Sequence, residues 1–350
     1  MSIPKLNQFL TLDKTLDDQK DLDKLCKDRP LYTEELFKPN AYYGNDYILK
    51  SFAGIPLHKP LKVLLEHGIR ISSNAPILKK FKTSFFPVIF YYSPLSYKLY
   101  KHSSHKILIH SASPFCYLLK LIDTNLTPSR KGTIFFPTHS THWITTTSNY
   151  ENISKKLDAL DERFKPITIC IYWRDYNLGH HKPFEKMGFK IVSGGHMYDP
   201  FFLFRFYHLC SLHQYSASNY WGSHFFYSIK SGCSYFHLKD DNDNIEINCD
   251  NPEMAKEYSP PSKIFINIER LFQKPSKKMS KKQLELIDIF LGAKYLETPQ
   301  KLTEVLNFAD RLDKFGFARH PKTSKTHYKV PNLLPRKLLR KIKTSLRRET

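Results

Sequence analysis

Short apolar segments alternate with longer segments of helical periodicity through the middle of the chain. The apolar segments are rich in β-branched and aromatic residues, which predicts strands at 87–92, 106–110, 132–136, 167–173, 189–192, 215–217 and 235–238. Helices are predicted between them from Ser113-Pro114 onward and at 150–163, 181–187, 199–212 and 222–231. Single helices between strands indicate parallel βαβ units, so the sequence predicts an α/β fold. Ligands of such folds bind at the carboxyl ends of the strands.

The alternation ends after Pro261, and amphipathic helices are expected from there on. One is predicted at 280–291 and a second after the cap Thr298-Pro299. Their apolar faces carry Leu284, Ile287 and Leu291, and Leu302, Val305 and Leu306, respectively. The pattern also breaks at 125–131, where we place a domain boundary. The chain is therefore expected to divide into 1–130, 131–270 and a helical segment with a basic tail at 271–350.

Charge indicates which partners to expect. The 350 residues include 54 Lys and Arg against 33 Asp and Glu, a formal net charge of +21. This excess points to nucleic acid, an anionic membrane face or phosphorylated ligands. The aromatic residues, 14% of the chain, lie mostly inside apolar runs such as 85–92 and 201–207, which favours core packing over the exposed rings that stack on bases. Nucleic acid is therefore not the favoured partner.

The cysteines and the apolar runs indicate the compartment. The six cysteines are scattered without a Cys-x-x-Cys pair, which argues against zinc and against a disulfide framework. No run of about 18 apolar residues is present, and residues 1–20 lack the apolar stretch of a secretory signal. We therefore expect a cytoplasmic protein.

The first candidate for chemistry is Glu66-His67-Gly68, which places two titratable groups at the end of an element. Either Glu66 or His67 can take a proton from an acceptor hydroxyl. The alternative interpretation is a solvated helix end with glycine as its cap.

The second candidate follows the strand at 132–136, where two histidines stand among hydroxyl residues. His139 can bind a phosphate or stabilise a leaving group at this strand end. His139 and His142 are three residues apart, but no nearby carboxylate or cysteine completes a metal site, so no metal is predicted.

The strongest candidate is the segment 216–224, between a short strand and an aromatic-rich helix. Its small polar residues open a helix, and a helix start binds phosphate through backbone N–H groups. The alternative is an ordinary capping loop. Two other predicted strands end next to candidate residues. Arg174 follows the strand at 167–173, and His196, preceded by two glycines, follows the strand at 189–192. The donor-binding residues predicted in this way are His139, Arg174, His196, Ser218, Asn219, Gly222 and Ser223.

Motifs of other enzyme classes are absent from the sequence. It contains no phosphate-binding P-loop, no Gly-x-Gly-x-x-Gly after a strand and no Gly-x-Ser-x-Gly elbow. The acidic run 240–244 lacks the glycine and closing glutamate of a calcium loop, and we interpret it as a solvated turn. No cofactor is predicted.

The order of these motifs resembles that of bacterial GT-B-type glycosyltransferases of surface-polysaccharide assembly, such as capsule or lipopolysaccharide. The likeness covers roughly residues 45–310 and rests on Glu66-His67-Gly68, on Pro-Thr-His-Ser-Thr at 137–141, and on Ser-Asn-x-x-Gly-Ser-His-x-x-Tyr at 218–227. It includes Phe-Leu-Gly at 290–292. The resemblance implies two Rossmann-like domains that face a cleft, with the acceptor in 1–130 and the nucleotide in 131–270. Tyr227 and Ser228 stand where some relatives carry a donor-ribose glutamate, which leaves the nucleotide open.

The resemblance also implies a function. It suggests metal-independent transfer of a sugar from a nucleotide-sugar donor to a saccharide or lipid-linked acceptor, with Glu66 or His67 as the base and His139, Ser218, Asn219, Gly222 and Ser223 near the donor phosphates. The alternatives are transfer of a phosphate-linked unit, of the glycerol-phosphate type, on the same fold, or a basic nucleic-acid-binding protein.

The last twenty residues, 331–350, contain seven Lys or Arg, and their apolar residues recur at helical spacing. Such a segment can lie on an anionic membrane surface, at the inner face of the cytoplasmic membrane. The other interpretations are a solvated basic tail or a nucleic-acid arm.

Overall fold

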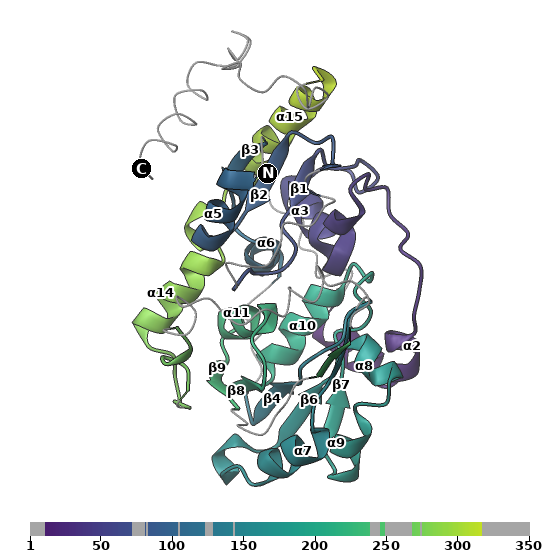
Figure 1. Cartoon of the computed structure of the whole chain (residues 1–350), viewed down its shortest axis with the longest axis vertical. Helices are drawn as coiled ribbons and strands as arrows, with labels where there is room; N and C mark the ends of the chain where they lie inside the picture. The colour runs from purple at the N-terminus through teal and green to yellow at the C-terminus, as the bar shows by residue number, and fades with distance from the viewer. Residues whose placement is uncertain are drawn as a thin grey trace.

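The computed structural model describes residues 11–71, 81, 83–103, 106–122, 129–142, 144–238, 246–248, 268–273 and 275–316. Two parallel sheets and the helices around them make up the fold, which confirms the predicted α/β class (Figure 1). The basic tail, the acidic run 240–244 and most of the predicted boundary at 125–131 lie outside the described residues. Within the described part of the chain, no helix has the length and the apolar character to cross a membrane.

The first sheet contains three parallel strands in the order β1-β2-β3. These strands are β1 (Val63–Leu65), β2 (Val88–Tyr91) and β3 (Ile107–His110). Its helices are α3 (Asn45–Ala53), α5 (Pro94–Ser103) and α6 (Pro114–Leu121). Ser113 is the N-cap of α6 and Pro114 its first residue, as predicted. Alternate residues of the strands face two different apolar clusters, so the sheet is buried on both faces.

The second sheet contains five parallel strands in the order β7-β6-β4-β8-β9. They are β4 (Thr133–Phe136), β6 (Ile167–Cys170), β7 (Lys190–Val192), β8 (Tyr215–Ser218) and β9 (Ser234–His237). The chain runs outward from β4 to β7 on one side and then returns to form β8 and β9 on the other. The carboxyl ends of β4 and β8 therefore flank the point where the strand order reverses, which is where ligands bind in open α/β sheets.

Helices cover both faces of this second sheet. α7 (Tyr150–Asp158) and α9 (Lys182–Lys186) pack on the outer face, and α10 (Phe202–Ser211) and α11 (Ser223–Lys230) on the face toward the first sheet (Figure 1). The short helices α8 (Trp173–Asn177) and η3 (Glu162–Phe164) connect strands. A small antiparallel pair joins β5 (Thr145–Thr147) to β10 (Glu246–Asn248).

Several predicted elements end earlier than expected. The strand predicted at 167–173 stops at Cys170, because α8 starts at Trp173, and the helix predicted at 150–163 stops at Asp158. β1 was not predicted from the sequence, because its three residues are too few to show a period. Glu66-His67-Gly68 therefore follows a strand and does not end a helix.

Each end of the described chain contacts the sheet that is farther from it in the sequence, at least in part. α1 (Leu12–Asp18) packs on α10 and α2 (Leu22–Cys26) on α8, so the first helices lie on the second sheet although they precede residue 130. At the other end, α14 (Lys281–Phe290) packs on α11, and α15 (Pro299–Lys314) packs on α3. η5 (Ala293–Tyr295) lies between them. Thr298 caps α15 as predicted, and Ser280, predicted as the first residue of a helix, is the N-cap of α14. Leu284 is 43% exposed, unlike Ile287 and Leu291, which are buried.

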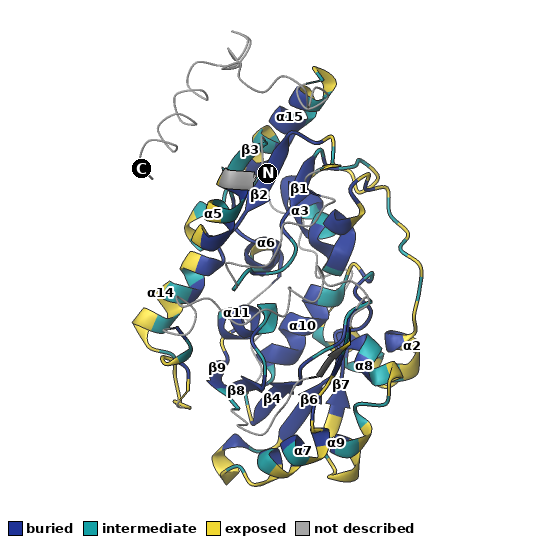
Figure 2. Ribbon diagram, in the orientation of Figure 1, coloured by how far each residue is buried: buried dark blue, intermediate teal, exposed yellow. Residues whose placement is uncertain are grey.

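One hydrophobic cluster joins helices of both sheets. Phe115 of α6 stacks on Tyr227 of α11 with ring centroids 4.5 Å apart, and Phe226 of α11 stacks on Phe290 of α14 at 5.2 Å. Figure 2 shows that most of the residues of α6, α10 and α11 are buried. Because interiors are close-packed, this shared core fixes the position of one sheet relative to the other.

Polar side chains hold the free edge of β1. In η2 (Lys38–Gly44), the Asn40 amide donates to the Val63 carbonyl (2.8 Å) and accepts from the Leu65 N–H (2.9 Å). Glu35 accepts from Asn40 and pairs with the buried Lys50 at 2.6 Å. Asn40 thus replaces the neighbouring strand that an edge strand lacks, and it sets the direction of the loop after β1.

We predict that Asn40→Ala lowers the free energy of unfolding by about 3 kcal/mol, because it leaves buried donors and acceptors of β1 without partners. Urea unfolding would measure the loss as a lower midpoint at constant slope. Gln300→Ala, an exposed change on α15, is the control and should leave the midpoint unchanged. Equal midpoints for Asn40→Ala and the wild-type protein would contradict the assigned role.

Candidate functional site

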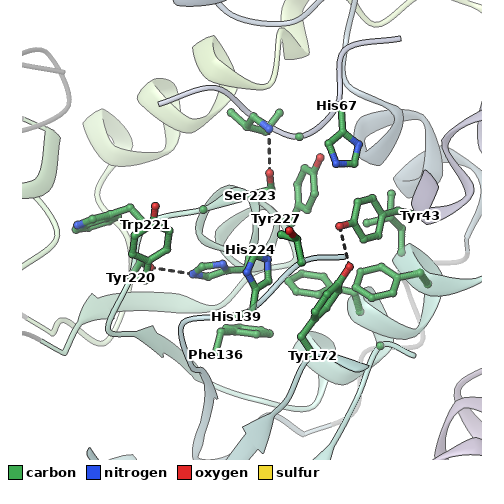
Figure 3. A pocket seen from close by; sticks show the side chains of 18 of the residues that line it. Tyr43, His67, Phe136, His139, Tyr172, Tyr220, Trp221, Ser223, His224 and Tyr227 are labelled. Carbon is green, nitrogen blue, oxygen red and sulfur yellow. Dashed lines mark hydrogen bonds between the residues drawn. The ribbon is translucent and has the colours of Figure 1, made fainter. Parts of the chain in front are cut away.

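A cavity of about 310 Å³ lies between the carboxyl ends of the two sheets (Figure 3). Residues 67–71 after β1 line one side of it, and residues after β4, β6 and β8 line the other. The wall on the second sheet is the point where the strand order reverses. Within the described residues, the lining contains no Asp or Glu, and Arg70 is the one fully charged cation in it.

Three imidazoles from separate elements line this cavity: His67 after β1, His139 after β4 and His224 in the first turn of α11. Burial is the main cause that lowers the pKa of His67 to about 4 and that of His224 to about 3. The charge of His139 contributes to both shifts, so the three rings lie within electrostatic reach of one another. His67 and His224 are therefore neutral at pH 7 and can accept or donate single protons.

The rings of His67 and His224 are held in different ways. His67 stacks on Tyr43 at 5.3 Å and meets Tyr42 edge-on, and its Nδ1 has no hydrogen-bond partner among the described residues. Nε2 of His224 lies 3.1 Å from the Tyr220 carbonyl. Because a carbonyl only accepts, Nε2 donates, and Nδ1 of neutral His224 is left as an acceptor. Packing thus orients the His67 ring, which lines the cavity, and buries its Nδ1.

The start of α11 forms part of the cavity wall, at the residues that the sequence predicted. Gly222 is its N-cap and offers no side-chain acceptor to the first-turn N–H groups. Ser223 Oγ accepts from the Ile69 N–H at 2.9 Å, which ties the loop after β1 to α11. Gly68 has φ +69°, and a Cβ there would come within 3.0 Å of Ser223 Oγ. Glycine is needed at this point both for its backbone angle and for the close approach.

Glu66 lies behind the cavity wall and does not line it. It is 2% exposed and accepts hydrogen bonds from the Tyr92 N–H at 3.1 Å and from the Ser96 hydroxyl. Arg70, which does line the cavity, lies 3.8 Å from the Glu66 carboxylate. Burial raises the pKa of Glu66 to about 7 against the opposing effect of Arg70. Glu66 therefore positions Arg70 and cannot reach a substrate hydroxyl in this arrangement.

Ser218 and Asn219, predicted near the donor phosphates, also lie outside the cavity lining. The Ser218 hydroxyl donates to the Tyr220 carbonyl and accepts from the Tyr220 N–H, which closes a local turn. The side-chain oxygen Oδ1 of Asn219 accepts from the Thr138 N–H at 2.9 Å. These side chains shape the loops after β4 and β8 that carry His139 and Gly222.

Arg174 and His196 lie farther from the cavity. Arg174 Nη2 contacts Thr145 Oγ1 at 3.4 Å, and neither residue lines the cavity. His196 is fully buried and lies 3.1 Å from Asp28. The structure therefore brings together His67, His139, Gly222 and Ser223 of the predicted site residues and places Glu66, Arg174, His196, Ser218 and Asn219 outside the lining.

Asp28, His142 and His196 have their ligand atoms within 4.8 Å of one another, close enough to consider a metal. The hydrogen bonds favour a different interpretation. Tyr198 N–H donates to Nδ1 of His196 at 3.1 Å, so the proton of the neutral ring is on Nε2, where it donates to Asp28. A protonated nitrogen has no lone pair for a metal, so these hydrogen bonds account for the cluster without an ion.

Sequence reasoning missed Arg70 and the tyrosines of the wall. The hydroxyls of Tyr43 and Tyr172 form a 3.2 Å hydrogen bond in the cavity wall, although 129 residues separate them in the chain (Figure 3). Contacts of this kind leave no local pattern. Arg70 follows Gly68 of the first candidate motif by two residues, and this nearness was the signal that could have found it.

Comparison with known proteins adds no relative, since neither a protein-family model nor a curated protein matches the chain.

The raised pKa of Glu66 predicts a pH-dependent stability. Between about pH 4.5 and pH 7 the unfolded carboxyl loses its proton while the folded one keeps it, so stability falls as pH rises through this window. A shift of this size corresponds to a loss of about 3 kcal/mol. We expect Glu66→Gln to remove this contribution. The free energy of unfolding of the variant, taken relative to that of the wild-type protein, should therefore increase from pH 5 to pH 8. Urea unfolding at both pH values measures it.

Glu34→Gln, at an exposed carboxyl, is the matched control and should show no such difference. If Glu66→Gln and the wild-type protein differ by the same amount at pH 5 and pH 8, the carboxyl is ionised in the folded protein throughout this range.

Proposed function

We propose that the protein is a glycosyltransferase of the GT-B type, in which two Rossmann-like units face a cleft and a nucleotide-sugar donor binds in the second. One observation carries the proposal. The carboxyl ends of two parallel sheets meet at one cavity, and the wall on the second sheet is the point of strand reversal, where α11 begins. Donor and acceptor would each bind at the strand ends of one sheet.

The donor phosphates are assigned to the second-sheet wall. The start of α11 offers backbone N–H groups and the positive end of the helix dipole, and no side chain caps it. His139 and Arg70 line the same cavity and can donate to phosphate oxygens. In this proposal these groups stabilise the negative charge that develops on the leaving phosphate. The described lining offers no carboxylate to a divalent cation, so the proposed transfer uses protein donors in that role.

The base is assigned to His67, on the opposite wall. Its ring nitrogen takes the proton of the acceptor hydroxyl while that oxygen bonds to the anomeric carbon of the sugar. The bond from the anomeric carbon to phosphate breaks at the same time, and its electron pair leaves with the nucleotide. The lowered pKa makes the imidazole of His67 a weak base, but the negative charge of phosphates bound in the same cavity favours the charged form of the ring and raises its pKa.

The acceptor follows from the same proposal: a surface polysaccharide or a lipid-linked saccharide, made at the inner face of the cytoplasmic membrane. A donor with a phosphate-linked unit, such as glycerol phosphate, presents the same nucleotide phosphates to α11. The transferred group therefore has to be identified by its product.

We expect one nucleotide of UDP, GDP, CMP and CDP to stabilise the protein in a thermal-shift screen, because the α11 start binds its phosphates. At about 100 times its dissociation constant, the gain is about 2.7 kcal/mol. Ser223→Ala and His139→Ala should each reduce this gain, while His58→Gln, at an exposed site outside the cavity, should not. A screen in which no nucleotide stabilises the protein would rule out the donor site.

The base is tested separately by His67→Gln. We expect turnover to fall by about 10²–10⁴-fold, since a positioned base contributes that much, with nucleotide affinity unchanged. Release of the nucleotide from the donor identified by the screen measures turnover, and calorimetry measures affinity. His58→Gln again serves as the control. Retention of wild-type turnover by His67→Gln would place the base elsewhere.

A further inference from the structure

A second cavity, of about 770 Å³, lies between α5 and the α14–η5 segment, on the outer side of the first sheet (Figure 1). α5 contributes Tyr97, Lys98 and Lys101 to it, and η5 contributes Lys294 and Tyr295. Neither the transfer chemistry nor the donor site proposed above uses any of these residues. The volume lies within the range of cavities that hold small organic ligands.

Aromatic rings form a closed column in this cavity. His110, at the end of β3, is stacked between Tyr91 at 4.4 Å and Tyr295 at 3.6 Å. Lys294 Nζ lies over the Tyr295 ring, 4.8 Å from its centroid, and the ring of Tyr97 packs against that of Tyr91. The rings thus cover one another or are covered by a cation. A nucleic-acid base needs an open ring face for stacking, so this column favours ligands that contact ring edges and phenol hydroxyls.

Positive charge surrounds the column. Lys98, Lys101 and Lys294 are exposed, and none of them forms a salt bridge with a described carboxylate. Asp288 is the one carboxylate among the described lining residues, and it is paired with Lys230. The cavity therefore presents three ammonium groups without an acidic counterpart, and an occupant with several negative charges would complement it.

The position of α5 connects this cavity to the first. Tyr100 of α5 lines the first cavity, while Tyr97, Lys98 and Lys101 line the second. Since a helix rises about 1.5 Å per residue, the two sets of side chains lie within about one turn of each other. An oligosaccharide that occupied both cavities would therefore have to run along α5.

We propose that the second cavity binds an acidic oligosaccharide, with its carboxylates or other anionic groups at Lys98, Lys101 and Lys294 and its hydroxyls at the tyrosine edges. The role of this oligosaccharide as the remote part of the acceptor chain rests on the proposed transferase function. The binding itself does not depend on that function and is measured without turnover.

The test compares two triple variants that change the net charge equally. Lys98→Ala/Lys101→Ala/Lys294→Ala removes the cations of the cavity, and Lys155→Ala/Lys182→Ala/Lys186→Ala removes exposed cations of α7 and α9 on the outer face of the second sheet. The probes are di- to hexasaccharides of sialic acid, of galacturonic acid and of heparin, with maltohexaose, single-stranded oligothymidylate and inorganic phosphate as comparisons. Calorimetry at low ionic strength measures affinity.

We expect at least one acidic series to bind the wild-type protein, more tightly as its length grows and more weakly as salt is added. The cavity variant should bind that series about tenfold more weakly, and the α7–α9 variant should match the wild-type protein, because only local cations pair with the ligand. Absence of binding by all three acidic series would overturn the proposal. So would an equal loss in both variants, or tighter binding of oligothymidylate or phosphate than of every acidic saccharide.

The two proposals fail in different ways. If no nucleotide stabilises the protein but the cavity variant alone loses acidic oligosaccharide, the transferase is wrong and the saccharide site stands. If nucleotides stabilise both triple variants and the wild-type protein equally and no acidic saccharide binds, the saccharide site is wrong and the donor site stands.

Discussion

The packing of α6 and α10 against α11 is the constraint on which the remaining structure depends. The stacked pair Phe115 and Tyr227 belongs to one hydrophobic cluster that includes residues from both sheets. With this core in place, the carboxyl ends of the two sheets face each other across a gap of fixed width. Finer positioning then comes from single polar contacts: Asn40 directs β1, and the hydroxyl of Ser223 holds the backbone of Ile69. Because the same cluster is dry and close-packed, relative motion of the two sheets would require repacking of large aromatic side chains.

Burial sets the charge state of the first cavity more than neighbouring charges do. It is the largest cause of the shifted pKa values of His67, His224 and Glu66. The side chains of the cavity therefore carry little charge apart from that of Arg70. An anionic ligand changes this balance, since it stabilises protonated imidazoles beside it. In the proposed function, binding of the donor and uptake of a proton would be linked events, and donor affinity would depend on pH.

Sequence patterns predicted the parts of this fold that local chemistry determines. The start of α6 at Pro114, the cap of α15 at Thr298 and the start of α11 follow from residues within a few positions of each other. The parallel sheets followed from the alternation of strands and helices. Site residues were harder to assign, because Ser218 and Glu66 have the same chemistry whether they face a ligand or a backbone N–H group. Which of the two they face depends on elements far along the chain.

The two short helices that open the described chain have a consequence for synthesis on the ribosome. Asp18 pairs with Arg205, and Gln19 with the backbone of Ser193, across 187 and 174 residues of chain. α1 and α2 are too short to be stable alone in water, so they have no partner until α8 and α10 have left the exit tunnel. α1 and α2 are thus made well before the helices on which they dock. Until then, the side chains of α1 and α2 that the fold buries, among them Leu25 and Cys26, stay exposed, and a chaperone able to hold them could bind while residues 27–211 are being made.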